Sequence, residues 1–191
     1  MKEPLTIALI YDFDGTLAPG NMQEYDFIPA VGKSNKEFWH DANQLAEEQD
    51  AEAFQESGRR VTLYKGVREW FARINAYGAA RGIRILHYIN SSGLKEIIEG
   101  TEIAHEFRRI YACSFLYDID GVAYWPAVAV NYTNKTQFIF KINKGVESVF
   151  DSKLVNQYIE EDKRPVPFRR MIYVGDGTTD IPCMRLVKNS G

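Results

Sequence analysis

Residues 6–16 read TIALIYDFDGT, an apolar run that ends in two carboxylates and a glycine. A continuous rather than alternating apolar run is typical of a strand that is covered on both faces. The run is too short for a signal peptide or a membrane-spanning helix. We therefore predict a buried first strand over Thr6–Tyr11, with Asp12 and Asp14 on the same side where the strand opens into a loop.

Further apolar runs follow along the chain, and stretches with helical spacing separate them. The other predicted strands are Ile83–Ile89, Ile110–Leu116 and Arg170–Val174. The predicted helices are Val67–Ala80, Lys95–Phe107, Lys135–Ile142 and Lys153–Glu161. Strands that alternate with helices predict an α/β fold, with a Rossmann-like three-layer αβα core around a parallel sheet.

A polar segment, residues 18–66, separates the first strand from the next helix. Within it, EFWHDANQLAEEQDAEAF at residues 37–54 has the character of a helix. We therefore predict a small helical cap at 18–66, inserted into a core made of residues 1–17 and 67–191. An insertion at this point lies above the carboxyl ends of the strands, where ligands bind in such sheets.

The composition of the sequence argues against two classes of partner, nucleic acids and membrane surfaces. The 23 basic and 26 acidic side chains give a net charge of −3, so no basic excess is available for a nucleic-acid partner. A polybasic segment for a membrane surface is also absent from the sequence. Cys113 and Cys183 have no repeated spacing, which favours reduced thiols and a cytoplasmic location.

The pair Asp12 and Asp14 is the first candidate site. Two carboxylates this close repel each other, and a bound cation or a shared proton usually relieves the repulsion. One carboxylate can attack phosphorus while its neighbour donates a proton to the leaving oxygen. Gly15 lets the chain turn away, and Thr16 offers a hydroxyl and an amide to a phosphate. The plain alternative is a turn with two solvated carboxylates.

A hydroxyl motif, Ser91-Ser92-Gly93, follows the second predicted strand. A serine hydroxyl there can hold a phosphoryl oxygen, with the amide of Gly93 close by. The alternative is an ordinary N-cap for the helix that begins near Leu94.

A lysine and an acidic loop complete the set. Lys135 starts a predicted helix, where it could neutralise phosphate, although a lone lysine is usually solvated. GDGTTD at residues 175–180 follows the last predicted strand. Its Asp176 and Asp180 could bind a hard cation together with Asp12, or could belong to a surface turn.

Taken in order, DFDGT, Ser91, Lys135 and GDGTTD resemble the four motifs of the haloacid dehalogenase (HAD)-like hydrolase superfamily. The resemblance spans Ile7 to Asp180, and its first and last motifs are specific. With a helical cap after the first strand, the layout looks most like the phosphoserine-phosphatase-type branch.

The resemblance implies a reaction and a Mg²⁺ cofactor. Asp12 would be the nucleophile that forms an aspartyl-phosphate, and Asp14 would be the general acid/base. The Asp12 carboxylate and the main-chain carbonyl of Asp14 would also bind the metal. Relatives with a second aspartate at this spacing are mostly phosphatases or phosphomutases, so Asp14 argues against dehalogenation.

The resemblance also implies ligands for the metal and the phosphoryl group. Asp176 would complete the Mg²⁺ site, and Asp180 would support it. Ser91 and Lys135 would hold the phosphoryl group.

For the hydroxyl and for the lysine that would hold the phosphoryl group, the sequence offers two candidates each. The glycine two places after the hydroxyl favours Ser91 over Ser92. The start of a predicted helix favours Lys135 over Lys144.

A second copy of the first motif, Asp118-Ile119-Asp120-Gly121, competes with the first. No strand that ends in Ser or Thr followed by Gly lies between it and Asp176. Residues 122–125 read as the return strand of a hairpin whose turn holds Asp120-Gly121. We therefore predict a hairpin within Phe115–Val130 rather than a second nucleophile.

The expected function is the Mg²⁺-dependent hydrolysis of a phosphomonoester on a small phosphorylated metabolite, with the cap selecting the leaving group. A phosphomutase would share the nucleophile and the acid. A non-catalytic binding or regulatory protein on the same fold is a third reading.

The last motif lies near the end of the sequence, with eleven residues between Asp180 and the end at Gly191. Relatives usually continue with another strand and helix. A shortened gene product or an unusually small sheet are the two interpretations. A small sheet would leave an exposed edge strand, so we also expect that the chain can form a homodimer.

Overall fold

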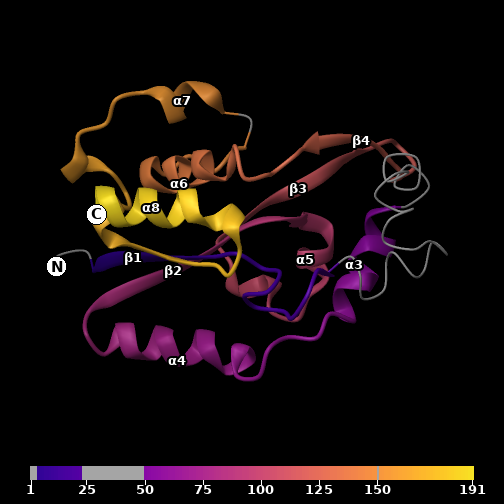
Figure 1. Cartoon of the computed structure of the whole chain (residues 1–191), viewed down its shortest axis with the longest axis horizontal. Coiled ribbons are helices and arrows are strands. Elements are labelled where there is room, and N and C mark those ends of the chain that lie inside the picture. Colours follow the sequence, from indigo (N-terminus) through magenta and orange to yellow (C-terminus); the bar gives the residue numbers. More distant parts are fainter. Residues whose placement is uncertain (1–3, 23–49, 150) are drawn as a thin grey trace.

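A five-stranded sheet forms the centre of the molecule (Figure 1). The computed structural model describes residues 4–22, 50–149 and 151–191. The strands are β1 (Leu5–Tyr11), β2 (Ile83–Leu94), β3 (Arg109–Tyr117), β4 (Ala123–Val128) and β5 (Met171–Val174). Their order is β4-β3-β2-β1-β5; β1, β2, β3 and β5 are parallel, and β4 is antiparallel to β3. The predicted α/β fold with a parallel sheet is therefore confirmed.

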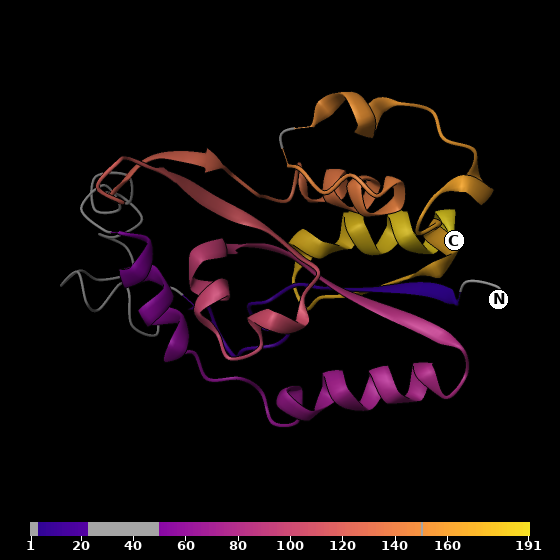
Figure 2. The same ribbon diagram turned by 180° about the vertical axis from the view of Figure 1, so that it is seen from behind.

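Helices cover both faces of this sheet, as Figures 1 and 2 show. On one face lie α3 (Ala51–Arg59), α4 (Val67–Ala79) and α5 (Lys95–Gly100). On the other face lie α6 (Lys135–Lys144) and α8 (Ile181–Ser190), with α7 (Ser152–Asn156) outside α6. Single 3₁₀ turns occur at Ala104–Glu106, Glu161–Lys163, Phe168–Arg170 and Thr178–Asp180.

Strand β1 explains the continuous apolar run. Ala8 and Ile10 pack into the core beneath α6 and α8, whereas Leu9 and Tyr11 pack into the core beneath α4. Because each face contacts a separate core, the alternating side chains from Ala8 to Tyr11 are all buried and all of these positions are apolar or aromatic.

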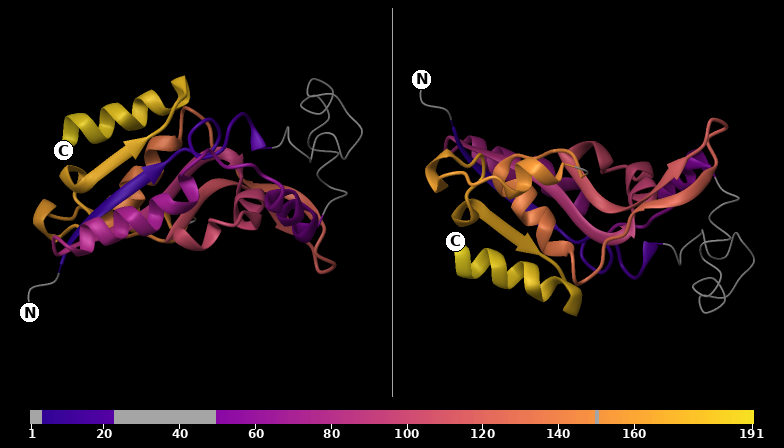
Figure 3. Two further views of the ribbon diagram at one scale, coloured as in Figure 1. Left: turned by 90° about the horizontal axis from the view of Figure 1, so that it is seen from below. Right: turned by 90° about the horizontal axis from the view of Figure 1, so that it is seen from above.

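The hairpin prediction is also confirmed. Asp118 Oδ1 accepts hydrogen bonds from the amides of Asp120 and Val122 at 3.0 and 2.9 Å. Gly121 has a φ of +82°, which a side chain would disfavour. The pair Asp118 and Asp120 therefore builds a turn, and Figure 3 shows the hairpin β3–β4 extending beyond the rest of the sheet.

Two predicted helices are shorter in the structure. The stretch Lys95–Phe107 is helical only as far as Gly100, after which the Thr101 hydroxyl and amide both donate to Ile98 O. The stretch Lys153–Glu161 contains only α7, because the backbone carbonyls of Val155 and Gln157 accept from the ammonium of Lys144 instead of from helical amides. The helix α8 was not predicted.

The inserted segment 18–66 is described in part. Residues 23–49, which include most of the predicted helical stretch 37–54, lie outside the described residues. Its last part forms α3, which packs directly on α5. A Cβ atom on Gly58 would lie 2.0 Å from Ile97 O, and one on Gly100 would lie 2.0 Å from Gln55 O. The division into a core and a cap stays a prediction.

A buried polar network lies under α4. The indole of Trp70 donates to Tyr11 OH at 2.8 Å, and Tyr11 OH lies 3.1 Å from His87 Nδ1. His87 Nε2 lies 3.0 Å from Asn75 Oδ1. Because Asn75 Oδ1 can only accept, the neutral imidazole carries its proton on Nε2, and Nδ1 accepts from the Tyr11 hydroxyl. Burial lowers the pKa of His87 to about 4.

We expect His87 to make folding pH-dependent. Between pH 6.5 and 4 the unfolded chain binds a proton that the folded protein excludes, so the contribution of neutral His87 is lost as the pH falls. The difference in unfolding free energy between the wild type and His87→Phe should shrink by about 3 kcal/mol over this range. Urea unfolding at several pH values measures it, because taking a difference removes contributions that both proteins share.

The exposed His105, replaced by Phe, serves as the matched control, because it lies outside the buried network. A difference for His87→Phe that stays constant over this pH range would contradict the assignment.

Candidate active site

The predicted site residues converge at the carboxyl end of the parallel strands. Asp12 follows β1, Asp176 follows β5, and Ser91 lies near the end of β2. Lys135 is the first residue of α6. Because parallel strands end at the same edge of a sheet, the segments after β1 and β5 and the end of β2 meet here, and the start of α6 joins them.

Three carboxylates and one ammonium form the centre. Asp12, Asp176 and Asp180 each place an oxygen within 4.8 Å of the others. Lys135 Nζ lies 3.2 Å from Asp12 Oδ2 and 2.8 Å from Asp180 Oδ1. Lys135 and Asp180 are both completely buried, so this charge pairing occurs out of water.

Asp12 is held on both of its oxygens. Oδ1 accepts from the amide of Phe13 at 2.8 Å, and Oδ2 faces Lys135. Burial raises the pKa of Asp12 to about 6; Lys135 opposes this shift, and the charge of Asp180 adds to it. The carboxylate therefore depends on nearby positive charge to stay ionised.

Asp14 lies across the turn from Asp12. Its Oδ1 accepts from the amide of Met22 at 2.8 Å. Burial is the main cause that raises the pKa of Asp14 to about 7. A Cβ atom on Gly93 would lie 3.2 Å from Asp14 Oδ2 and 2.3 Å from the methyl carbon of Met22. The glycine of the hydroxyl motif therefore leaves the space that Asp14 and Met22 occupy.

The loops after β1 and β5 touch each other. Gly15 has a φ of +73°, and a Cβ atom there would lie 2.1 Å from Asp176 Oδ2. Thr16 Oγ1 is 3.4 Å from Asp176 Oδ1, which makes a weak hydrogen bond. Asp176 is exposed, whereas Asp12 and Asp180 are buried. It is thus the carboxylate of the cluster that is most open to an incoming ligand.

The two serines differ in their surroundings. Ser91 is buried, and its Oγ accepts from the amide of Gly93 at 3.0 Å, which leaves the hydroxyl proton of Ser91 free to donate. Ser92 is exposed. Both lie at the end of β2.

The two lysines are separated by the length of α6. Lys144 donates to Val155 O and Gln157 O, whereas Lys135 contacts Asp12 and Asp180. Lys135 is the one that the structure places in the cluster.

Two site residues escaped the sequence analysis. Tyr173 donates its hydroxyl to Asp180 Oδ1 at 2.8 Å, and the side chain of Asn90 donates to the carbonyl of Lys135 at 3.1 Å. Both are polar groups in or at the end of predicted buried strands. A polar group in such a place needs a hydrogen-bond partner, so its presence in an apolar strand was the feature of the sequence that could have indicated a role in the site.

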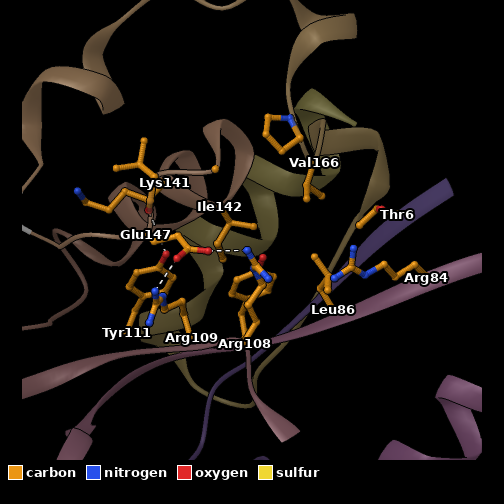
Figure 4. Close-up of a pocket in the computed structure, with 14 residues that line it drawn as sticks. Thr6, Arg84, Leu86, Arg108, Arg109, Tyr111, Lys141, Ile142, Glu147 and Val166 are labelled. Atoms are coloured by element: carbon orange, nitrogen blue, oxygen red, sulfur yellow. Dashed lines mark hydrogen bonds and ion pairs between the residues drawn. The ribbon is translucent and has the colours of Figure 1, made fainter. Parts of the chain in front are cut away.

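A separate cavity of about 340 Å³ lies at the other end of the sheet (Figure 4). Its walls include Thr6, Arg84 and Arg109, which lie at the starts of β1, β2 and β3. There Glu147 forms ion pairs with Arg108 and Arg109. None of the acidic cluster lines this cavity.

None of the helices in the described ranges is long and apolar enough to cross a membrane.

The described fold matches solved structures over nearly the whole chain. A HAD family hydrolase from Salmonella enterica serovar Typhi aligns with a TM-score of 0.64 at 15% identity, over 95% of this chain and 60% of that one. A substrate-bound phosphoserine phosphatase aligns with a TM-score of 0.61 at 13% identity, over 93% of this chain and 81% of that one. This chain has a HAD-type fold.

The branch of the fold agrees with the sequence resemblance. A phospho-aspartyl intermediate analogue of phosphoserine phosphatase also aligns, with a TM-score of 0.56 at 17% identity, over 94% of this chain and 82% of that one. The HAD-type, phosphoserine-phosphatase-like fold is thus confirmed. The chain spans less than two thirds of the Salmonella hydrolase, with which it shares the HAD-type core.

Sequence comparison adds one relative. An uncharacterized protein of Borreliella burgdorferi is 27% identical, over 96% of this chain and 79% of that protein. No protein-family profile matches the sequence.

Replacing Lys135 by Met should destabilise the protein strongly. The change leaves Asp12 and Asp180 as two buried carboxylates without their cation, at a cost of about 3–5 kcal/mol. Lys144→Met removes two hydrogen bonds to main-chain carbonyls at the other end of the same helix, and should cost about 1–2 kcal/mol. Chemical denaturation at pH 7.5 measures both, and equal losses would contradict the buried pairing.

Proposed function

We propose that this protein is a magnesium-dependent phosphatase, which hydrolyses a small-molecule phosphomonoester through an aspartyl-phosphate on Asp12. The observation that carries the proposal is the position of the Asp12 carboxylate. It is fixed at the end of β1 by the Phe13 amide and lies against the buried ammonium of Lys135, within reach of Asp176.

The nucleophile would act as follows. A carboxylate oxygen of Asp12 attacks phosphorus, the bond from phosphorus to the leaving oxygen breaks, and Asp14 gives its proton to that oxygen. Water then attacks the phosphorus of the aspartyl-phosphate, and Asp14 takes a proton from it. Inorganic phosphate leaves, and the carboxylate of Asp12 is restored.

The contacts of Asp14 support this proton transfer. The amide of Met22 holds one of its oxygens, so the other stays available to a leaving group or a water molecule. Proton transfer between groups that are already held in place needs little rearrangement during the reaction.

The donor set fits a hard divalent cation. Among the described residues, three carboxylates face a single ammonium, which leaves an excess of negative charge, and Mg²⁺ prefers oxygen ligands. Asp12, Asp176 and the main-chain carbonyl of Asp14 would hold the ion, and Asp180 would support the arrangement. The ion would supply positive charge to the phosphoryl oxygens and to the nucleophile.

The remaining groups would bind the phosphoryl oxygens. Ser91 keeps a hydroxyl proton that it can donate, because its oxygen already accepts from Gly93. Lys135 lies next to the nucleophile, and Gly15 and Thr16 belong to the turn that follows it. Phosphoryl transfer is governed by charge and positioning, so such donors contribute most of the stabilisation.

The substrate would be a small phosphorylated metabolite, with the leaving group selected by residues 18–66. We place this reaction in the cytoplasm and propose no nucleic-acid or membrane partner. β5 pairs on one side with β1 and is an edge of the described sheet, so a second copy of the chain could pair there.

Asp12→Asn should lower the turnover of p-nitrophenyl phosphate by roughly 10³-fold or more, because an amide cannot form the covalent intermediate. The matched control is Asp118→Asn in the second copy of the motif. Its side-chain oxygen can still accept from the two amides of the hairpin turn, so the control should retain full activity.

Removal of Mg²⁺ by a chelator should stop turnover, and its return should restore it. Acid-quenched protein should carry a phosphoryl group on a peptide that contains Asp12. Activity that survives Asp12→Asn would refute the mechanism. Isomerisation of sugar phosphates without release of inorganic phosphate would instead identify a phosphomutase.

A further inference from the structure

Tyr173 contacts the centre of the site but has no part in the reaction proposed above. It lies on β5, and its hydroxyl donates to Asp180 Oδ1 at 2.8 Å. The same hydroxyl is 3.4 Å from the carbonyl of Asn90 on β2. The side chain therefore reaches from the edge strand past β1 to the carboxyl end of β2.

The hydroxyl shares one oxygen with the buried ammonium. Asp180 Oδ1 accepts from Tyr173 and from Lys135 Nζ, both at 2.8 Å, while Oδ2 accepts from the Gly177 amide at 3.2 Å. A carboxylate oxygen has two lone pairs, so the two donors saturate Oδ1. The rotation of the Asp180 carboxylate is thus fixed by three donors.

The orientation of Asp180 decides where the ammonium of Lys135 sits. Lys135 Nζ is held between Asp180 at 2.8 Å and Asp12 at 3.2 Å, and no part of the lysine is exposed to water. If Asp180 lost one donor, its carboxylate could turn and carry the ammonium away from Asp12. A buried charge is sensitive to such a change, because no solvent can replace the lost contact.

We propose that Tyr173 is a positioning residue, whose hydroxyl holds Asp180 so that Lys135 stays against the Asp12 nucleophile. The inference rests on the proposed function, since it concerns the same reaction. The Tyr173 hydroxyl donates to Asp180 and not to the Asp12 nucleophile. It acts through Asp180 and Lys135.

The alternative is that Tyr173 serves only the packing of β5. A packing role belongs to the ring, which Phe would retain, and predicts a change in stability without a specific change in rate. A positioning role belongs to the hydroxyl. It predicts a lower kcat with little change in KM, because an interaction needed when charge moves from Asp12 to the phosphoryl oxygens acts in the transition state.

The test compares Tyr173→Phe with Tyr111→Phe. Tyr111 is a buried tyrosine and Tyr173 a partly buried one, but the Tyr111 hydroxyl donates to the carbonyl of Val146 at 3.3 Å and not to the cluster. Turnover of p-nitrophenyl phosphate with saturating Mg²⁺ should fall by about 10- to 100-fold in kcat for Tyr173→Phe, as expected for a lost hydrogen bond to a charged group. KM should stay within about twofold, and Tyr111→Phe should match the wild type.

A double-mutant cycle with Asp180→Asn tests the route of the effect. If Tyr173 acts through Asp180, then Tyr173→Phe should change kcat by less than about twofold in the Asp180→Asn background. A wild-type kcat in Tyr173→Phe, an effect that simply adds to that of Asp180→Asn, or failure of Tyr173→Phe alone to fold would each overturn the inference. An inactive wild-type protein would count against the proposed function, whereas an active wild type with an equally active Tyr173→Phe would count against this inference alone.

Discussion

The ammonium group of Lys135 lies between the carboxylates of Asp12 and Asp180, and none of its side chain reaches solvent. An ammonium in such a place is stable only if the chain holds counter-charges around it before any ligand arrives. The end of β1 and the turn before α8 provide these counter-charges, and the start of α6 provides the lysine, so three separate parts of the fold are involved. The architecture of the core can be understood as the scaffold that brings these three parts to one point.

Glycines are as important to this convergence as the charged residues. A Cβ atom on Gly15 would meet Asp176, one on Gly93 would meet Met22 and come close to Asp14, and one on Gly175 would lie 2.6 Å from an oxygen of Asp180. At the end of each of β1, β2 and β5, a glycine therefore allows the backbone to approach an acidic or neighbouring side chain. The carboxylates can lie close together because the glycines of these loops have no side chains that would collide with them.

The layers of the fold were predictable from the sequence, because continuous apolar runs report strands that are buried on both faces. The resemblance of the ordered motifs likewise grouped Asp12, Lys135 and Asp176, and Asp12 and Asp176 follow parallel strands that end at one edge. Other features depended on contacts between distant residues. At the end of α5, Gly100 packs against α3, and at the end of α7, Lys144 donates to the carbonyls of Val155 and Gln157. Tyr173 looked like an ordinary strand residue, because its partner Asp180 is identified only when the loop folds back on β5.

The contact between Gly58 and Gly100 joins two regions that are distant in the sequence. With no side chain between them, the backbones of α3 and α5 are in direct contact. α3 belongs to the segment inserted after β1, and α5 begins immediately after the strand that carries Ser91 and Gly93. The absence of two side chains thus lets the end of the inserted segment lie directly against the helix that follows the serine motif.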